Sequence, residues 1–198
     1  MGKLKDYIDD GAHERGRLYD ELVSIKGLDH QLDIYTCEIY EFMTALTKMI
    51  IGRIGIDKFY DELADFIICS EQFLVYSAST DTSYNDGTKA LFGTLEFDNI
   101  LADDYKPLRF AQQRPKTETG RLALIDTTSL ISEILKLIND LRNGNVDIVM
   151  FTTLASQVAN TVAGLLQSRG SQSEQTLVVT LQYKIERLRV RVAENINL

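Results

Sequence analysis

The sequence is poor in cysteine and proline, and it contains no tryptophan. Its two cysteines, Cys37 and Cys69, are far apart, and no CxxC motif or Cys/His cluster accompanies them, so a structural zinc site is not expected. Two isolated cysteines are typical of a reducing compartment, where they behave as small apolar residues. We therefore expect a cytoplasmic protein. Two prolines and twelve glycines also exclude collagen-like and proline-rich classes.

Long apolar runs are absent as well. A helix that spans a bilayer needs about 18–20 consecutive apolar residues. The most hydrophobic stretch, 67–78, is interrupted by Glu71 and Gln72. Residues 1–10 lack the apolar run of a signal peptide. We expect no membrane-spanning segment.

Acidic residues outnumber basic ones by 29 to 21, which gives a net charge of −8. Nucleic-acid binders and proteins that dock on anionic membranes use clustered Lys and Arg, so we expect neither nucleic acid nor a membrane among the partners. The hydrophobic share of 44% and the charged share of 25% are those of a globular protein. A chain of 198 residues can bury one core, or form two small domains packed together.

Apolar residues recur at three- and four-residue steps along most of the chain, which predicts an all-α protein. The basic residues near the end of the chain suit the negative end of a helix dipole, and we expect them on a solvated face. These residues are Lys184, Arg187, Arg189 and Arg191. Helices are expected before Gly27 and over 32–50, 57–78, 122–142, 149–166 and 177–195.

The helical periodicity fails between 88 and 119, where both prolines occur. We therefore divide the chain into a helical half, 1–80, a connecting insertion, 81–119, and a second helical half with the terminal helix, 120–198. A short helix is expected over 97–103. The apolar residues of the insertion are too numerous for a free linker, so we expect some of them to dock on the core.

The two helical halves can be aligned, which suggests an internal repeat. The pattern around Glu38 falls on that around Glu133, and residues 59–65 resemble 150–156 at a slightly shorter spacing. In this register the apolar positions are kept, whereas three acids are lost. Glu41 becomes Lys136, Glu62 becomes Thr153 and Asp65 becomes Ser156. The alternative is that any two amphipathic helix pairs align this well by chance.

The most informative feature is a set of four acids in the first half. Glu38 and Glu41 are three residues apart on one expected helix, and Glu62 and Asp65 are three apart on the next. Residues at this spacing share a helix face, and the connecting stretch lets the two helices pack antiparallel. Four carboxylates without a counter-charge would raise one another's pKa, and a cation removes that penalty. Mg²⁺, or Mn²⁺ in its place, prefers such oxygen ligands and commonly bridges substrate phosphates.

Two other interpretations of these acids remain open. The acids could lie on solvated faces, with Lys48, Arg53 or Lys58 as partners. A di-iron carboxylate bundle is the rival metal site, but it normally uses Glu-x-x-His pairs. The two histidines, His13 and His30, belong to neither acidic pair.

The acidic motifs and their context resemble the MazG-like all-α nucleoside triphosphate pyrophosphatases of bacteria and phages. That family has EExxE on one helix and ExxD on the next, and here residues 37–41 read CEIYE and residues 62–65 read ELAD. The similarity extends to the residues that lead into the first acidic helix, to a lysine at the end of that helix, to the residues after ExxD and to a terminal KLERLxxR-like segment. These are residues 27–32, Lys48, residues 70–73 and residues 184–191.

The resemblance implies a MazG-like antiparallel helical bundle that hydrolyses a nucleoside or deoxynucleoside triphosphate to the monophosphate and pyrophosphate. It implies Mg²⁺ bound by Glu38, Glu41, Glu62 and Asp65, with Glu41, beside Glu38, orienting the attacking water. It also implies a base pocket near Gln31 with residues from a neighbouring copy, while Lys48 or Lys58 adds charge at the phosphates. In this picture the degenerate second half supplies the partner bundle, as a tandem pseudo-dimer in one chain, and a homo-oligomer is the alternative.

Cys37 stands where the family has the first acid of EExxE, so activity does not follow from the motif alone. One rival function is a nucleotide-binding or sequestering protein without turnover. Another is a helical scaffold whose acids are merely solvated. The identity of the base and of the sugar is not encoded in any motif that we find.

Overall fold

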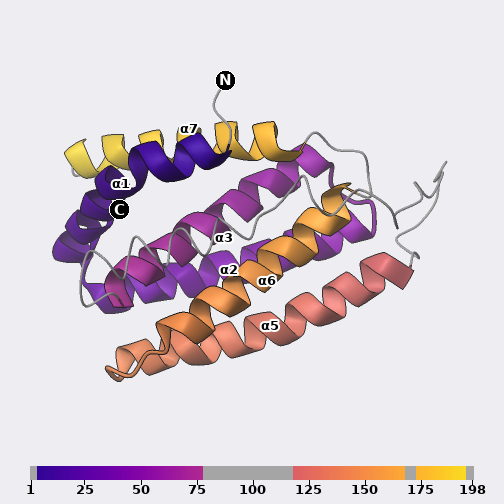
Figure 1. Ribbon diagram of the computed structural model, residues 1–198, viewed down its shortest axis with the longest axis horizontal. Helices are drawn as coiled ribbons and strands as arrows, with labels where there is room; N and C mark the ends of the chain where they lie inside the picture. Colours follow the sequence, from indigo (N-terminus) through magenta and orange to yellow (C-terminus); the bar gives the residue numbers. More distant parts are fainter. Residues whose placement is uncertain (1–3, 78–117, 168–172, 195–198) are drawn as a thin grey trace.

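The computed structural model describes residues 4–77, 118–167 and 173–194, and all regular structure within these ranges is α-helical (Figure 1). This confirms the expectation of an all-α protein. Three helices, α2, α5 and α7, begin about one turn earlier than their apolar patterns indicate. The short helix expected over 97–103 lies outside the described residues. The helices are α1 (Leu4–Lys26), α2 (Leu28–Ile50), α3 (Ile56–Ser77), α5 (Glu118–Arg142), α6 (Ile148–Gln167) and α7 (Ser173–Glu194).

Two helical hairpins form the centre of the molecule, and both turn through the same C-terminal cap. In the α2–α3 turn Gly52 has a φ of 70° and donates its N–H to the Met49 carbonyl at 3.0 Å. In the α5–α6 turn Gly144 has a φ of 76° and donates to the Leu141 carbonyl, also at 3.0 Å. The next N–H group in each turn reaches one residue further back, to Lys48 and to Asp140. This is the Schellman arrangement, which requires a left-handed residue at the position that glycine occupies.

The matching caps fix the register between the two halves at a constant offset of 92 residues, from Gly52 to Gly144. The buried positions obey the same offset on both helices: Ile39 pairs with Ile131, Phe59 with Phe151, and Ala64 with Ser156. The register expected from the sequence, which changed between the two helices, was therefore wrong. The corrected equivalents of Glu38, Glu41, Glu62 and Asp65 are Leu130, Glu133, Leu154 and Gln157.

The two hairpins pack on each other, α2 against α5 and α3 against α6, while α1 and α7 lie side by side along the outer side of α3 (Figure 1). Aromatic rings pack within the first hairpin and between the two hairpins. Phe42 of α2 stacks on Phe66 of α3 at 4.8 Å between ring centroids, and Phe73 of α3 stacks on Phe151 of α6 at 4.0 Å. Each such pair adds about 0.5–1.5 kcal/mol beyond the burial of its area. This aromatic layer holds the acidic helices α2 and α3 in place.

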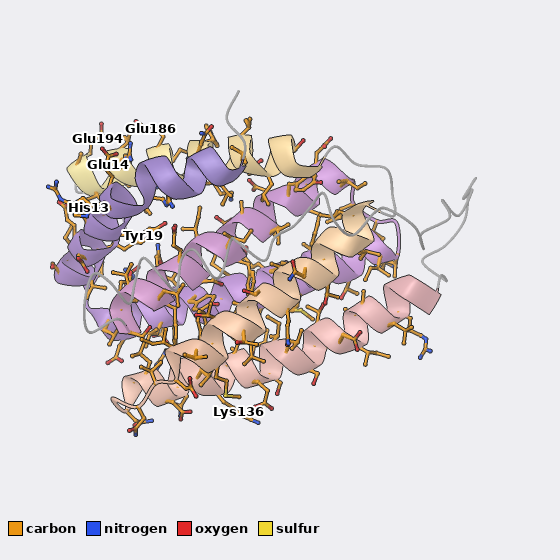
Figure 2. The ribbon with its side chains drawn as sticks, viewed as in Figure 1. His13, Glu14, Tyr19, Lys136, Glu186 and Glu194 are labelled. Atoms are coloured by element: carbon orange, nitrogen blue, oxygen red, sulfur yellow. The ribbon has the colours of Figure 1, made fainter. Side chains whose placement is uncertain are left out.

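A buried ion pair fastens α1 to α3. Arg15 donates from Nη2 to Glu71 Oε1 at 2.8 Å and from Nε to Oε2 at 3.0 Å. Tyr19, which points from α1 toward α3, donates to Glu71 Oε2 at 2.8 Å (Figure 2). The side chains of Arg15 and Glu71 are 2% and 0% exposed. Glu71, which interrupts the most apolar stretch of the sequence, is thus neutralised in the core rather than placed on a surface.

Candidate functional site

Three of the four predicted acids meet across the α2–α3 hairpin. One carboxylate oxygen from each of Glu38, Glu41 and Glu62 lies within 4.8 Å of the other two. Glu38 and Glu62 are half-buried, and Glu41 is exposed. The arrangement follows from the three-residue spacing on α2 and from the antiparallel packing of α3, as expected from the sequence. We call these three residues the glutamate triad.

The fourth acid, Asp65, is held by a lysine from α7. Lys184 donates from Nζ to Asp65 Oδ2 and lies 3.1 Å from Asp61 Oδ1. The Lys184 side chain is only 15% exposed. The expectation that the basic residues of the last helix form a solvated face was therefore wrong for Lys184, because α7 packs against α3 with this residue at the contact. The cation beside the acids is Lys184, whereas Lys48, Arg53 and Lys58, the partners considered from the sequence, are exposed.

Burial and mutual repulsion raise the pKa values of Glu38, Glu62 and Asp65, and so favour their protonated forms. Burial and, to a smaller extent, the charges of Asp65 and Glu41 together raise the pKa of Glu38 to about 7, although the positive charge of Lys184 opposes them. The pKa values of Glu62 and Asp65 are raised as well, first by burial. Burial opposes the charge on Lys184, but the hydrogen bond and charge of Asp65 outweigh it and raise the lysine pKa. The region therefore carries more negative charge than one lysine neutralises, which favours a further cation.

A cavity of about 320 Å³ opens beside the triad, between α1, α2, α3 and α7. Its volume is at the lower end of the range for small-molecule sites. Acidic groups from α2 and α3 and three basic groups from α7 contribute to its lining, so it offers both cation ligands and anion ligands. The lining residues are Leu22, Gln31, Ile34, Glu38, Asp65, Ile68, Cys69, Gln72, Lys184, Arg187, Leu188 and Arg191.

Gln31 is the residue of this cavity that most directly indicates a ligand. It is 3% exposed, and its Nε2 has no hydrogen-bond partner. An unpaired buried amide costs about 1–3 kcal/mol, so native structures rarely keep one without a reason. The sequence resemblance implied a base pocket near Gln31. In the structure, the Gln31 side chain forms part of the cavity wall.

The remaining predicted residues lie apart from the cavity. Lys48 is exposed in the last turn of α2, Lys58 is exposed in the first turn of α3, and neither lines the cavity. A contact between either lysine and a phosphate stays a prediction. Cys69 is buried, as expected of a small apolar residue, but Cys37 is exposed, so that expectation was wrong for Cys37. His13 and His30 are exposed and outside the triad.

The equivalent positions of the second hairpin do not carry the same set of acids. Leu130 and Leu154, partly buried, replace Glu38 and Glu62, and Gln157 replaces Asp65. Glu133, the equivalent of Glu41, is paired with Lys136 at 2.7 Å on the outer side of α5 (Figure 2). Within the described residues, only the first hairpin brings three potential metal ligands together.

Comparisons of the chain with protein-family models, with curated proteins and with solved structures return no match. Among the described residues, none of the helices combines the length and the apolar character needed to cross a membrane.

Proposed function

We propose that the protein is a Mg²⁺-dependent nucleoside triphosphate pyrophosphohydrolase, which converts a nucleoside or deoxynucleoside triphosphate and water to the monophosphate and pyrophosphate. The observation that carries this proposal is the convergence of the glutamate triad, within 4.8 Å, at a cavity that is lined by one of its members, Glu38, and by three basic residues of α7. The resemblance of the acidic motifs to MazG-like pyrophosphatases supports the same reaction.

The residues present fit a hard divalent cation. The triad offers oxygen donors alone, which Mg²⁺ and Mn²⁺ prefer, and it has neither the thiolate nor the imidazole that a zinc site commonly uses. A cation held by Glu38, Glu41 and Glu62 would favour the ionised forms of Glu38 and Glu62, which burial now disfavours. When bound, the metal would neutralise phosphate oxygens and lower the pKa of the attacking water.

The protein's own groups would bind and orient the triphosphate. Arg187 and Arg191, one turn apart on α7, can donate to phosphate oxygens, and charge-assisted bonds from arginine to phosphate are among the stronger hydrogen bonds in proteins. The unpaired Nε2 of Gln31 can donate to an acceptor on the base. Glu41 is the exposed member of the triad, so it is the carboxylate that water reaches most readily and the candidate to orient that water.

The test is pyrophosphate release from a panel of nucleoside and deoxynucleoside triphosphates, with Mg²⁺ and with EDTA. At least one triphosphate should be hydrolysed only with the metal. Glu62→Gln should lower kcat/KM at least about 100-fold, equivalent to about 2.7 kcal/mol of transition-state stabilisation. The matched control is Glu133→Gln, which changes the acid at the position of the second hairpin equivalent to Glu41 and should leave the rate unchanged. If the Glu62→Gln variant hydrolyses as fast as the parent, the site is wrongly assigned.

Nucleotide binding without turnover is the second candidate, and two observations favour it. Cys37 stands where the family motif has its first acid. Asp65, the last acid of the motif, is already ion-paired with Lys184. This function predicts Mg²⁺-dependent nucleotide affinity without pyrophosphate release. The helical scaffold predicts no thermal shift with any nucleotide and Mg²⁺.

A further inference from the structure

The five carboxylates around this site fall into two groups. The oxygens of the glutamate triad converge on one point, and no lysine or arginine is paired with them in the described residues. Asp65 and Asp61 instead share the ammonium group of Lys184. The same lysine charge acts on Glu38 and Glu62, so Lys184 lies within the electrostatic reach of the triad while bonded to its neighbours.

Lys184 is held in this position by the packing of α7. Leu181 and Ile185, which flank it on the helix, are 0% and 5% exposed, and α7 packs along α3. The lysine side chain crosses from α7 to the acidic face of α3 and is largely covered. A divalent ion at Asp65 would either displace this ammonium group or stand beside a like charge.

We propose that Lys184 is a built-in cation that takes the place of a second divalent ion at Asp65, so that the site binds one divalent ion, on Glu38, Glu41 and Glu62. This inference rests on the proposed function and specifies its metal requirement. Lys184 would then supply the second positive charge, fixed by the fold, in the lining of the cavity to which Arg187 and Arg191 also contribute. The unpaired Nε2 of Gln31 in the same cavity is the independent sign that a ligand belongs there.

The number of bound ions tests this directly, without turnover. Mn²⁺ is titrated into the nucleotide-free protein by calorimetry, and the spin coupling is read by electron paramagnetic resonance. The parent should bind one Mn²⁺ and give the spectrum of an isolated ion. Lys184→Met frees Asp65 and Asp61 and should bind two, with a spectrum of coupled ions. Lys184→Arg, which keeps the charge, should bind one.

Two further variants serve as controls. Asp65→Asn should still bind one Mn²⁺ with an affinity within about threefold of the parent, because Asp65 is not one of its ligands. Lys136→Met removes another lysine that is ion-paired with a glutamate, on the side of the molecule away from α7, and should leave one ion bound (Figure 2). Circular dichroism and thermal unfolding check that every variant is folded.

The outcomes separate this inference from the proposed function. Two ions in the parent would overturn the role of Lys184 and leave the pyrophosphohydrolase proposal standing. One ion in both the parent and a folded Lys184→Met would also overturn it. If Lys184→Met does not fold, the number of ions in the parent and the Mn²⁺ affinity of Asp65→Asn decide whether the role of Lys184 stands. No bound Mn²⁺ in the parent would remove the metal site and the proposed function together.

Discussion

Replacing Glu38 with glutamine should stabilise the metal-free protein at neutral and alkaline pH. The pKa of this carboxyl is about 7 in the folded state against 4.5 for an unperturbed glutamate. Below pH 4.5 the group is protonated in both states, and its favourable contribution is fully present. As the pH rises through 7 that contribution is lost, because the unfolded chain releases its proton first and the folded state must then bury a charge. The free energy of unfolding therefore falls across this window.

The size of the effect follows from the shift and from the partial exposure of the group. A shift from 4.5 to about 7 corresponds to about 3 kcal/mol if none of it is screened. Glu38 is half-buried, so solvent screening reduces this to about 1–2 kcal/mol. For a chain of this size, that gain should raise the Tm of Glu38→Gln by about 2–8 °C at pH 8.

Urea unfolding in EDTA at pH 4.5 and at pH 8 measures this difference. The parent and Glu38→Gln should differ little at pH 4.5, and the variant should be the more stable at pH 8. Adding Mg²⁺ at pH 8 should stabilise the parent and have a smaller effect on the variant, which has lost one charged oxygen ligand. If the variant is no more stable than the parent at pH 8 without metal, the strain assigned to this carboxylate does not exist.

Three other changes have expected outcomes. Glu71→Gln leaves the Arg15 charge buried without its partner and should cost about 3–5 kcal/mol in urea unfolding, whereas Glu133→Gln at an exposed pair should cost about 0.5 kcal/mol or less. Phe151→Ala should cost about 3–5 kcal/mol by the same measurement, because its ring joins the two hairpins; a cost below 1 kcal/mol would contradict that packing. Gln31→Met should leave stability unchanged or raised, yet weaken nucleotide binding in calorimetry; unchanged affinity would remove Gln31 from the site.

The helices and the acidic hairpin could be predicted because both depend on local spacing. Apolar residues at three- and four-residue steps define a helix wherever they occur, and the pairs Glu38/Glu41 and Glu62/Asp65 share a face whatever packs around them. The register of the internal repeat could not be read in the same way. Steps of three and four fit two neighbouring faces of α5 almost equally well, and the matched turns at Gly52 and Gly144 were needed to choose between them.

The residues whose partners could not be predicted from the sequence are those whose environment depends on distant helices. Lys184 is one of several basic residues near the end of the chain and was expected on a solvated face. Only the packing of α7 on α3 brings it to Asp65. Glu71 finds its partner Arg15 on another helix. The one sequence signal for Lys184 was the similarity of residues 184–191 to the terminal segment of the MazG-like family. That resemblance did not indicate which charge the lysine meets.

The position of bond cleavage tests the central claim most directly. A triphosphate that the protein hydrolyses is incubated with the protein and Mg²⁺, and phosphorus-31 NMR identifies the products. The triad and the cavity, taken as a pyrophosphohydrolase site, predict the monophosphate and pyrophosphate as the only products. Their formation should stop with EDTA and in Glu62→Gln. Release of a diphosphate and inorganic phosphate, or hydrolysis that survives both the chelator and the substitution, would contradict the proposed reaction.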